Sequence, residues 1–216
     1  RPQQVRKMTP SGGLAILAAG FSSSGIALDP SGNVYVSDGG DFIQRLGAGG
    51  ALSIVAGIPQ TIGDTDAGFG GDGGPALAAR MTNPVGLAWD TSGNLYFADS
   101  GNHRIRRIGP DGIIQTIAGT GEAGFGGDNG PAASAQLRNP EGVALDRAGN
   151  LYIADTNNHR VRRVSPAGTI TTYAGSGRGG FAGDGGPATN ANLVNPHYLA
   201  FDEAGNLYVS DGTHRV

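Results

Sequence analysis

The feature that most constrains the fold is an internal repeat in which one phrase returns at a fixed spacing. The asparagines of a recurring GNLY phrase are evenly spaced along the chain, at Asn94, Asn150 and Asn206. The chain reads NPVGLAWDTSGNLYFADSGNHRIRRIG from position 83 and NPEGVALDRAGNLYIADTNNHRVRRVS from position 139. A shorter copy starts at position 195 and a more divergent copy starts near position 24. Self-similarity at a fixed period indicates a repeat architecture in which each copy is one supersecondary unit.

Each copy predicts four short strands. In the second copy they are GLAWD, LYFAD, RIRRI and IIQTIAG, separated by the polar turns TSGN, SGNH and GPDG. Glycine makes up 40 of the 216 residues and interrupts every segment, which disfavours long helices. A four-stranded antiparallel sheet repeated at this spacing is typical of the blade of a β-propeller.

The strands found at the two ends of the chain predict the number of blades. The segment VRKMTPSGGLAILAAG supplies a third and a fourth strand, whereas the segment after position 195 supplies a first and a second. We therefore expect an all-β fold with one propeller domain over residues 1–216 and four blade-equivalents. These cover about 22–57, 83–119, 139–175, and 195–216 together with 5–20. Pairing of the N- and C-terminal strands in one blade would remove the open edges.

The overall composition limits the classes of partner. The net charge is −3, and charged residues are mixed along the chain without an acidic or basic block. This gives no general attraction to nucleic acid or to an anionic membrane. There is no cysteine, so disulfides and thiolate chemistry are absent. No apolar run reaches the roughly 18–20 residues of a membrane-spanning helix. Whether a signal peptide preceded the first residue stays open.

The pattern NPxG(V/L)AxDxxGNLYxADxxNHR(I/V)RR(I/V) resembles the NHL repeat. The Asn-His-Leu of that family is written Asn-His-Arg at positions 102–104 and 158–160, and Thr-His-Arg at 213–215, while the first copy lacks the histidine. The resemblance implies a β-propeller, usually with six blades, so four blade-equivalents depart from the family. The GDGGPA connectors look like those of bacterial members, which favours an extracytoplasmic or secreted location.

The residues that recur in every copy have a structural interpretation. Short polar side chains in the first turn are expected to bond turn backbone groups. The aspartate before each His-Arg pair, the histidine and the arginine are expected to bond carboxylates or carbonyls across the loop. We expect the doubled arginines at 106–107 and 162–163 to lie near the rim, facing solvent or a neighbouring blade. The structural repeat set is Asp99, His103, Arg104, Asp155, His159, Arg160, Asp211, His214 and Arg215.

The connector GFGGDGGPA and its two variants raise three possibilities. A calcium site would use Asp72, Asp128 and Asp184, because glycines allow carbonyls to converge on a cation. A phosphate cradle would need a following helix and a lysine, and neither is present. We favour a structural connector in which the phenylalanine inserts as an apolar anchor and the aspartate bonds backbone amides. In an up-and-down sheet the connector and the SGNH loop share one face, and long loops on a scaffold often bind ligands.

Residues that break the repeat are the better candidates for binding, because symmetry does not explain them. His197 and Tyr198 replace the VG and EG of the preceding copies, at the start of an innermost strand near the axis. Glu141 and Arg138 lie at the matching entrance of another blade. Tyr and His suit sugar or peptide contact through an apolar body with a polar tip.

We therefore expect a non-catalytic binding propeller for a protein, peptide or glycan, without a cofactor. The alternative is a propeller fragment, or a self-assembling unit that forms a homodimer by sharing blades. Some NHL-like propellers are lyases or hydrolases that use histidine-bound metal, but His197 alone lies near the axis and one histidine makes no such site. Some NHL propellers bind RNA; the acidic balance and the lack of interleaved aromatics on the arginine strands disfavour that function here.

Overall fold

The computed structural model describes residues 3–21, 23–38, 40–59 and 68–212. Within these residues the chain forms three four-stranded and two two-stranded antiparallel sheets, which confirms the all-β fold. The strands are β1 (Gln3–Met8), β2 (Leu14–Phe21), β3 (Ser23–Leu28), β4 (Val34–Asp38), β5 (Phe42–Leu46), β6 (Leu52–Gly57), β7 (Pro84–Trp89), β8 (Leu95–Asp99), β9 (Arg104–Ile108), β10 (Ile114–Ala118), β11 (Val143–Leu145), β12 (Leu151–Asp155), β13 (Arg160–Val164), β14 (Ile170–Ala174), β15 (Leu199–Phe201) and β16 (Leu207–Val209).

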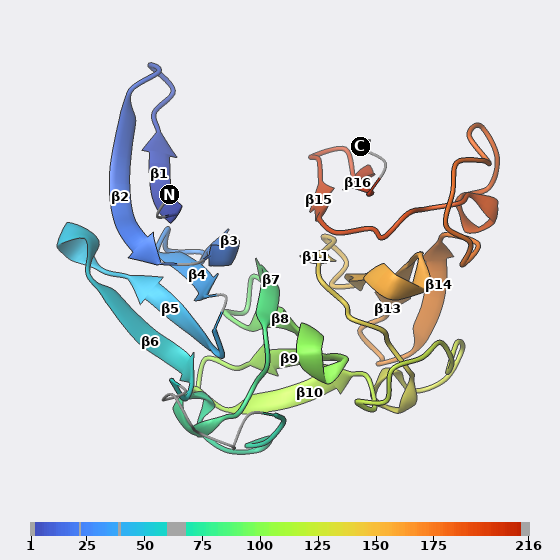
Figure 1. Cartoon of the computed structure of the whole chain (residues 1–216), viewed down its shortest axis with the longest axis horizontal. Coiled ribbons are helices and arrows are strands. Elements are labelled where there is room, and N and C mark those ends of the chain that lie inside the picture. Colours follow the sequence, from blue (N-terminus) through green and yellow to red (C-terminus); the bar gives the residue numbers. More distant parts are fainter. Residues whose placement is uncertain (1–2, 22, 39, 60–67, 213–216) are drawn as a thin grey trace.

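The sheets are arranged as the blades of a propeller. Each complete blade has its strands in chain order, as β3–β4–β5–β6, β7–β8–β9–β10 and β11–β12–β13–β14. Figure 1 shows them side by side around a central axis, with the first strand of each blade innermost and the fourth outermost. The predicted strand order is therefore confirmed, and the observed strands closely match the predicted segments.

The two terminal strand pairs do not form one blade, contrary to the prediction. β1–β2 and β15–β16 are separate two-stranded sheets in the part of the chain that the structure describes. Figure 1 shows them at opposite ends of an open arc, blue at one end and red at the other. Neither terminal pair therefore reaches the other to complete a four-stranded sheet.

The hydrophobic core lies between adjoining blades. One cluster joins the second and third blades through residues such as Ile105, Ala118, Val143 and Ile153, all less than a tenth exposed. A second cluster joins the first and second blades, with Phe97 fully buried. Burial of one such aliphatic or aromatic side chain contributes about 1.5–3 kcal/mol. The core therefore stabilises a blade through its neighbours, as in other repeat proteins.

Short 3-10 turns occur in the loops of the blades, and some of them pack between neighbouring blades. Three of them follow the connector prolines, η2 (Ala76–Ala78), η4 (Ala132–Ser134) and η6 (Ala188–Asn190). The alanines at 76, 79, 132 and 135 are at most 2% exposed. Two further turns, η3 (Ser100–Asn102) and η5 (Thr156–Asn158), join the second and third strands, and η1 (Ala48–Gly50) lies in the first blade.

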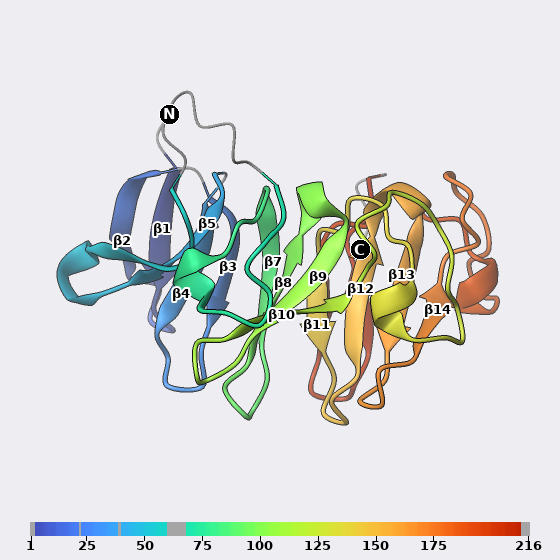
Figure 2. The ribbon, with the colours of Figure 1, turned by 90° about the horizontal axis from the view of Figure 1, so that it is seen from below.

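The first turn of each blade is held by its aspartate. Asp90 accepts the backbone N–H groups of Ser92 and Asn94 at 2.9 and 2.8 Å, and also the Asn94 amide and the Tyr96 hydroxyl. Asp146 repeats this set in the next blade. The prediction of turn bonding is therefore confirmed. Figure 2 shows these hairpin turns together at the lower face of the disc.

Candidate functional site

The glycine connectors lie on the outer wall of the blades and not on one face. Asn102 donates to the carbonyl of Gly68 where the connector starts, and Ala76 donates to the carbonyl of Gly112 in the turn at the other end of the blade. In between, Gly73 and Gly74 pair with Ile114 at the edge of β10. The connector thus runs along the outermost strand of the blade that follows it. This corrects the prediction that connectors and SGNH loops share one face, because the connector's backbone groups satisfy an otherwise open strand edge.

The connector aspartate forms an ion pair with a buried arginine. Asp72 Oδ1 lies 2.8 Å from Arg106 Nη2, and its Oδ2 accepts the backbone N–H of Thr116. Arg106 also donates to the carbonyls of Gly70 and Arg80 at 2.8 and 2.7 Å. Asp72 does bond a backbone amide, as predicted, but that amide belongs to Thr116 of β10, and the main partner of the carboxylate is the guanidinium. The guanidinium binds both the aspartate and the connector backbone, so this one side chain clamps the connector to its blade.

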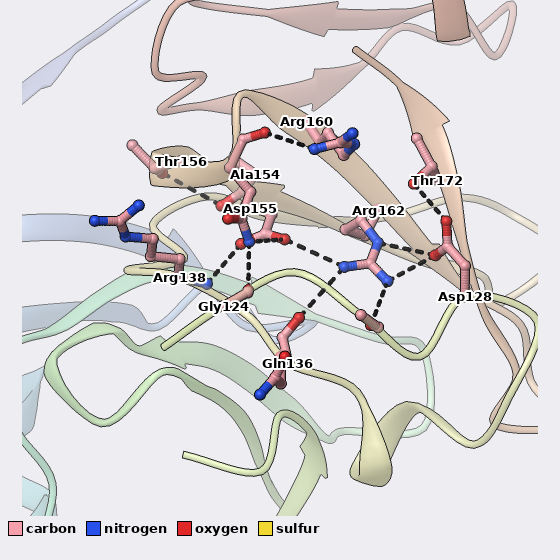
Figure 3. A network of polar contacts seen from close by, with 12 residues as sticks. Gly124, Asp128, Gln136, Arg138, Ala154, Asp155, Thr156, Arg160, Arg162 and Thr172 are labelled. Atoms are coloured by element: carbon pink, nitrogen blue, oxygen red, sulfur yellow. Dashed lines mark hydrogen bonds and ion pairs between the residues drawn. The ribbon is translucent and has the colours of Figure 1, made fainter. Parts of the chain in front are cut away.

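The third blade repeats the same clamp, shown in Figure 3. Arg162 Nη2 lies 2.6 Å from Asp128 Oδ1, and Asp128 Oδ2 accepts the Thr172 hydroxyl at 2.6 Å. Arg162 also donates to the carbonyls of Gly126 and Gln136. The ion pair and both carbonyl contacts recur in the two blades, and only the threonine group that the second carboxylate oxygen accepts differs, so the clamp is a property of the repeat.

The position of Arg106 and Arg162 differs from the prediction. Both side chains are fully buried, whereas the doubled arginines were expected near the rim facing solvent or a neighbouring blade. A buried guanidinium needs a carboxylate and further acceptors to offset its desolvation. One feature of the sequence could have indicated this contact. The arginine and the connector aspartate recur with the same period, and their separation is the same for Asp72 and Arg106 as for Asp128 and Arg162.

The connector phenylalanines stack on arginines. The guanidinium carbons of Arg104 and Arg106 lie 3.8 and 4.9 Å from the centre of the Phe69 ring. Arg160 and Arg162 repeat these distances on Phe125. Phe69 is 38% exposed, so the expected insertion beneath the connector is wrong. The ring is held by cation–π contact on its face, which contributes about 0.5–1 kcal/mol at an exposed site.

Asp99 and Asp155 are fully buried and complete the clamp. Asp99 accepts the backbone N–H of Thr82 and the amide of Asn102, both at 2.8 Å, and lies 3.4 Å from Arg106. Burial raises the pKa of the Asp99 carboxyl to about 6, against the opposing effect of these donors. Burial raises the pKa of Asp155 in the same direction.

The recurring histidines hold neighbouring blades together. His103 Nδ1 accepts the backbone N–H of Asn139 at 3.2 Å, and His159 accepts that of Asn195 at the same distance. Burial, followed by the charges of Arg104 and Arg138, lowers the pKa of His103, so the ring stays neutral and Nδ1 is free to accept. In the first blade, Asp41 accepts the N–H of Asn83 at this place. The sequence analysis missed Asp41, which stands where the histidine is absent.

The remaining members of the repeat set make structural bonds or lie outside the described residues. Arg104 donates to the carbonyls of Asn102 and Thr120, and Arg160 does the same with those of Asn158 and Ser176. Asp211 accepts the backbone N–H of Val194. His214 and Arg215 lie outside the described residues. None of the sets that the structure describes converges on another, since each belongs to its own blade.

A hollow of about 390 Å³ lies at the axis, where the inner strands begin. Three glycines from three blades line it, Gly25, Gly86 and Gly142, each followed by an aliphatic residue that also lines it. A Cβ on Gly86 would clash with the carbonyl of Glu141, and one on Gly142 would clash with that of His197. Glycine is therefore needed at this place because the next blade's backbone lies directly against it. The fourth blade has Tyr198 there, 62% exposed and facing this hollow.

His197 and Glu141 form a polar pair next to the residues that line the hollow, since Tyr198 and Gly142 follow them in the sequence. His197 Nδ1 lies 2.7 Å from Glu141 Oε2, and both side chains are a little over a third exposed. They occupy equivalent places in adjacent blades, so the pair bridges the third and fourth blades. The structure thus brings two of the four predicted binding residues into contact, and the third, Tyr198, follows His197 in the sequence. Arg138 lies elsewhere: its side chain is exposed beside His103, and its backbone N–H bonds Asp155.

The calcium prediction for the connector aspartates stays a prediction. Asp72 and Asp128 each engage both carboxylate oxygens with protein donors. Asp184 is exposed. Within the described part of the chain, no group of three or more His, Asp or Glu side chains gathers as a metal site.

The fold and its clamped repeats define this chain as a β-propeller with long interblade connectors. The family model "Teneurin NHL domain" matches residues 48–125, and the model "NHL repeat" matches residues 137–164. The chain belongs to the NHL-repeat family, as the sequence pattern predicts. No helix among the described residues is long and apolar enough to cross a membrane.

Relatives share the repeat over part of their length. The chain is 34% identical over 146 residues to Protein SUPPRESSOR OF QUENCHING 1, chloroplastic, of Arabidopsis thaliana, covering 65% of this chain and 14% of that protein. It is 33% identical over 162 residues to NHL repeat-containing protein 2 of Homo sapiens, covering 67% of this chain and 21% of that protein. The chain therefore spans about a fifth or less of these relatives.

Solved structures share the fold at low identity. A protein of unknown function from Bacteroides thetaiotaomicron superposes with a TM-score of 0.72 and 17% identity, covering 95% of this chain and 50% of that chain. Virginiamycin B lyase from Staphylococcus aureus superposes with a TM-score of 0.54 and 14% identity, covering 98% of this chain and 53% of that one. The chain spans about half of each of these structures.

Proposed function

We propose that the chain is a non-catalytic binding module that holds a polypeptide segment of a partner protein at the mouth of the axial hollow. The observation that carries the proposal is the break in symmetry there. Three blades present glycine to the axis, while the fourth presents Tyr198 beside the His197–Glu141 pair. Residues that the repeat does not require are concentrated at this one place.

The chemistry of the hollow suits a polypeptide. Glycines from three blades line it and leave their main chain uncovered by a side chain, and the strand pairing of β7 with β8 shifts at Gly86, which makes a bulge at the wall. Such a wall favours main-chain pairing with an extended segment. Tyr198 supplies an exposed ring with a polar tip, and Glu141 supplies a carboxylate at the rim. These features support binding at the hollow. The first two connectors are weaker candidates for the binding site, because their aspartates already bind the clamp arginines.

A glycan is the second candidate, because an exposed tyrosine beside a carboxylate also suits a sugar ring. Catalysis has less support. The repeated Asp–His–Arg sets are engaged in separate blades, and His197 has one acidic partner. An extracytoplasmic location, inferred from the connector type, belongs to the same proposal.

The test is a binding screen with a matched variant. A peptide display library and a glycan array are presented to the wild-type chain and to Tyr198→Gly, which installs the residue that the other blades have and so keeps the fold. We expect a peptide ligand that Tyr198→Gly weakens at least tenfold, while Tyr173→Ala on an outer strand leaves its affinity unchanged. Enrichment from the glycan array alone would replace the polypeptide with a sugar. Ligands indifferent to Tyr198, His197 and Glu141 would refute the axial site.

A further inference from the structure

A second hollow, of about 500 Å³, lies between the first and second blades at the face that carries the hairpin turns (Figure 2). We name it the interblade pocket. Both blades that form it are complete four-stranded sheets. β7 begins beside the axial hollow, with Gly86, and ends at the interblade pocket, with Trp89, so the two sites lie at opposite ends of this strand. The large side chains that line the interblade pocket are Tyr35, Val55, Trp89, Leu95 and Ile108.

Trp89 gives the interblade pocket a side chain that the repeat does not require. It is the one tryptophan of the chain, and leucine stands at the equivalent position in the first and third blades, as Leu28 and Leu145. The centres of the Trp89 and Tyr35 rings lie 4.8 Å apart, with their planes at 58°. The indole N–H is buried and has no acceptor among the described residues. A buried donor without an acceptor is unfavourable, and a ligand oxygen beside the ring would supply one.

The rim of the interblade pocket carries uncharged hydroxyl groups from both blades. Ser31 lies in the first turn of one blade, and Thr91 and Ser92 lie in the first turn of the next, and all three are exposed. Their hydroxyl groups have no partner among the residues that the structure describes. In the third and fourth blades, Arg147 and Glu203 stand at the position of Thr91, and alanine stands at that of Ser92. An aromatic pair framed by hydroxyl groups is therefore specific to this junction.

The charges around the interblade pocket disfavour an ionic ligand. None of the described residues that line it is lysine, arginine or histidine, so an anion finds no countercharge. Asp29 contributes a carboxylate, but its own turn engages both oxygens. Oδ1 accepts the backbone N–H groups of Ser31 and Asn33 at 2.9 and 2.8 Å, and Oδ2 accepts the Asn33 amide at 2.7 Å. The pocket therefore suits a neutral molecule that has both apolar C–H groups and hydroxyl groups.

We propose that the interblade pocket binds a neutral saccharide, independently of the polypeptide proposed for the axial hollow. The C–H groups of a pyranose ring pack on the Trp89 and Tyr35 rings, whose faces carry partial negative charge. The sugar hydroxyl groups bond the hydroxyl groups of Ser31, Thr91 and Ser92. An apolar wall with a few placed polar groups is the usual composition of a small-molecule site. A purely apolar ligand would leave these hydroxyl groups unused.

The single tryptophan allows a direct test, because its fluorescence reports on the interblade pocket alone. The whole chain is titrated with glucose, galactose, mannose, N-acetylglucosamine and their disaccharides while the emission of Trp89 is recorded. We expect a saturable change with at least one of these sugars. Choline chloride and inorganic phosphate serve as cationic and anionic control probes and should give none. A response to choline or phosphate alone, or to no saccharide, would overturn the proposal.

Variants that copy the other blades separate binding from folding. Trp89→Leu installs the residue of the first and third blades, and a double Ser31→Ala, Ser92→Ala variant removes two rim hydroxyl groups. By calorimetry we expect Trp89→Leu to weaken the sugar by about tenfold or more and the double variant by about threefold or more. Arg147→Ala, in an exposed turn outside the pocket, should leave the affinity unchanged. A sugar bound equally well by Trp89→Leu, or weakened by Tyr198→Gly instead, would refute the interblade pocket as its site.

Discussion

Arg106 is fully buried, yet its guanidinium reaches two carboxylates and two carbonyl oxygens. These contacts explain why the residue recurs: it joins a strand, a connector and the buried Asp99 at one point. At the residue scale, then, the recurring polar side chains serve the scaffold. The side chains that occur once, such as Tyr198, are the ones that we propose for recognition.

The first prediction concerns the buried carboxyl of Asp99. Its pKa is about 6 in the folded chain and near 3.8 when unfolded, so the folded state holds more protons between these values. The free energy of unfolding contributed by Asp99 therefore falls as the pH rises from about 4 to about 6. We expect the destabilisation caused by Asp99→Asn to be larger at pH 4 than at pH 7. Denaturant unfolding of both proteins at several pH values measures it. A penalty that grows with pH would mean that the ion pair with Arg106 outweighs burial.

At the scale of elements, the connector acts as an additional edge strand with one charged clamp. It pairs its backbone with the rim of β10 or β14 and packs the alanines of the following 3-10 turn between blades. The glycines permit this close path. Gly71 has a φ of +85°, and a Cβ added to it would collide with Ala79. The third connector has the same sequence features, but among the described residues no strand pairs with it as β10 and β14 pair with the first two connectors.

This difference gives an internal control for the second prediction. Asp72→Ala removes an ion pair with a fully buried arginine and should lower the free energy of unfolding by about 2–3 kcal/mol. Asp184→Ala removes an exposed carboxylate and should change it by less than about 0.5 kcal/mol when the chain is monomeric. Chemical unfolding at low protein concentration compares the two. Equal effects would show that the clamp does not stabilise the connector.

At the scale of the whole molecule, the blades form a one-dimensional array, because each contacts only its neighbours. The middle blades are covered on both sides, whereas β1–β2 and β15–β16 are each covered on one side only. In such arrays stability is a sum of repeat and interface contributions, and it falls toward the ends.

The third prediction follows from this gradient. Amide hydrogen exchange should be slowest in β8, β9, β12 and β13, and at least tenfold faster in β1–β2 and β15–β16 of the monomer. Mass spectrometry of peptides resolves these strands. Equal exchange rates in all strands would contradict the expected fall in stability from the middle blades toward the ends.

Local patterns in the chain were enough to predict the strands, their order and the first turns. LYFAD and RIRRI became β8 and β9 because alternation and turn residues act over a few positions. The pairing of His197 with Glu141 was also within reach, since the repeat places both at the same point of adjacent blades.

Three features were decided only by tertiary structure. The path of the connector depends on the open edge of a strand that comes much later in the chain, so no local pattern shows it. The burial of Arg106 depends on that path, because only the covering connector removes it from water. Whether the terminal strand pairs meet depends on how each blade packs on the next. That packing is set by many small contacts between blades, which no local sequence pattern shows. The sequence by itself therefore determined what each blade is, and packing between blades decided where its charged groups lie and which edges stay open.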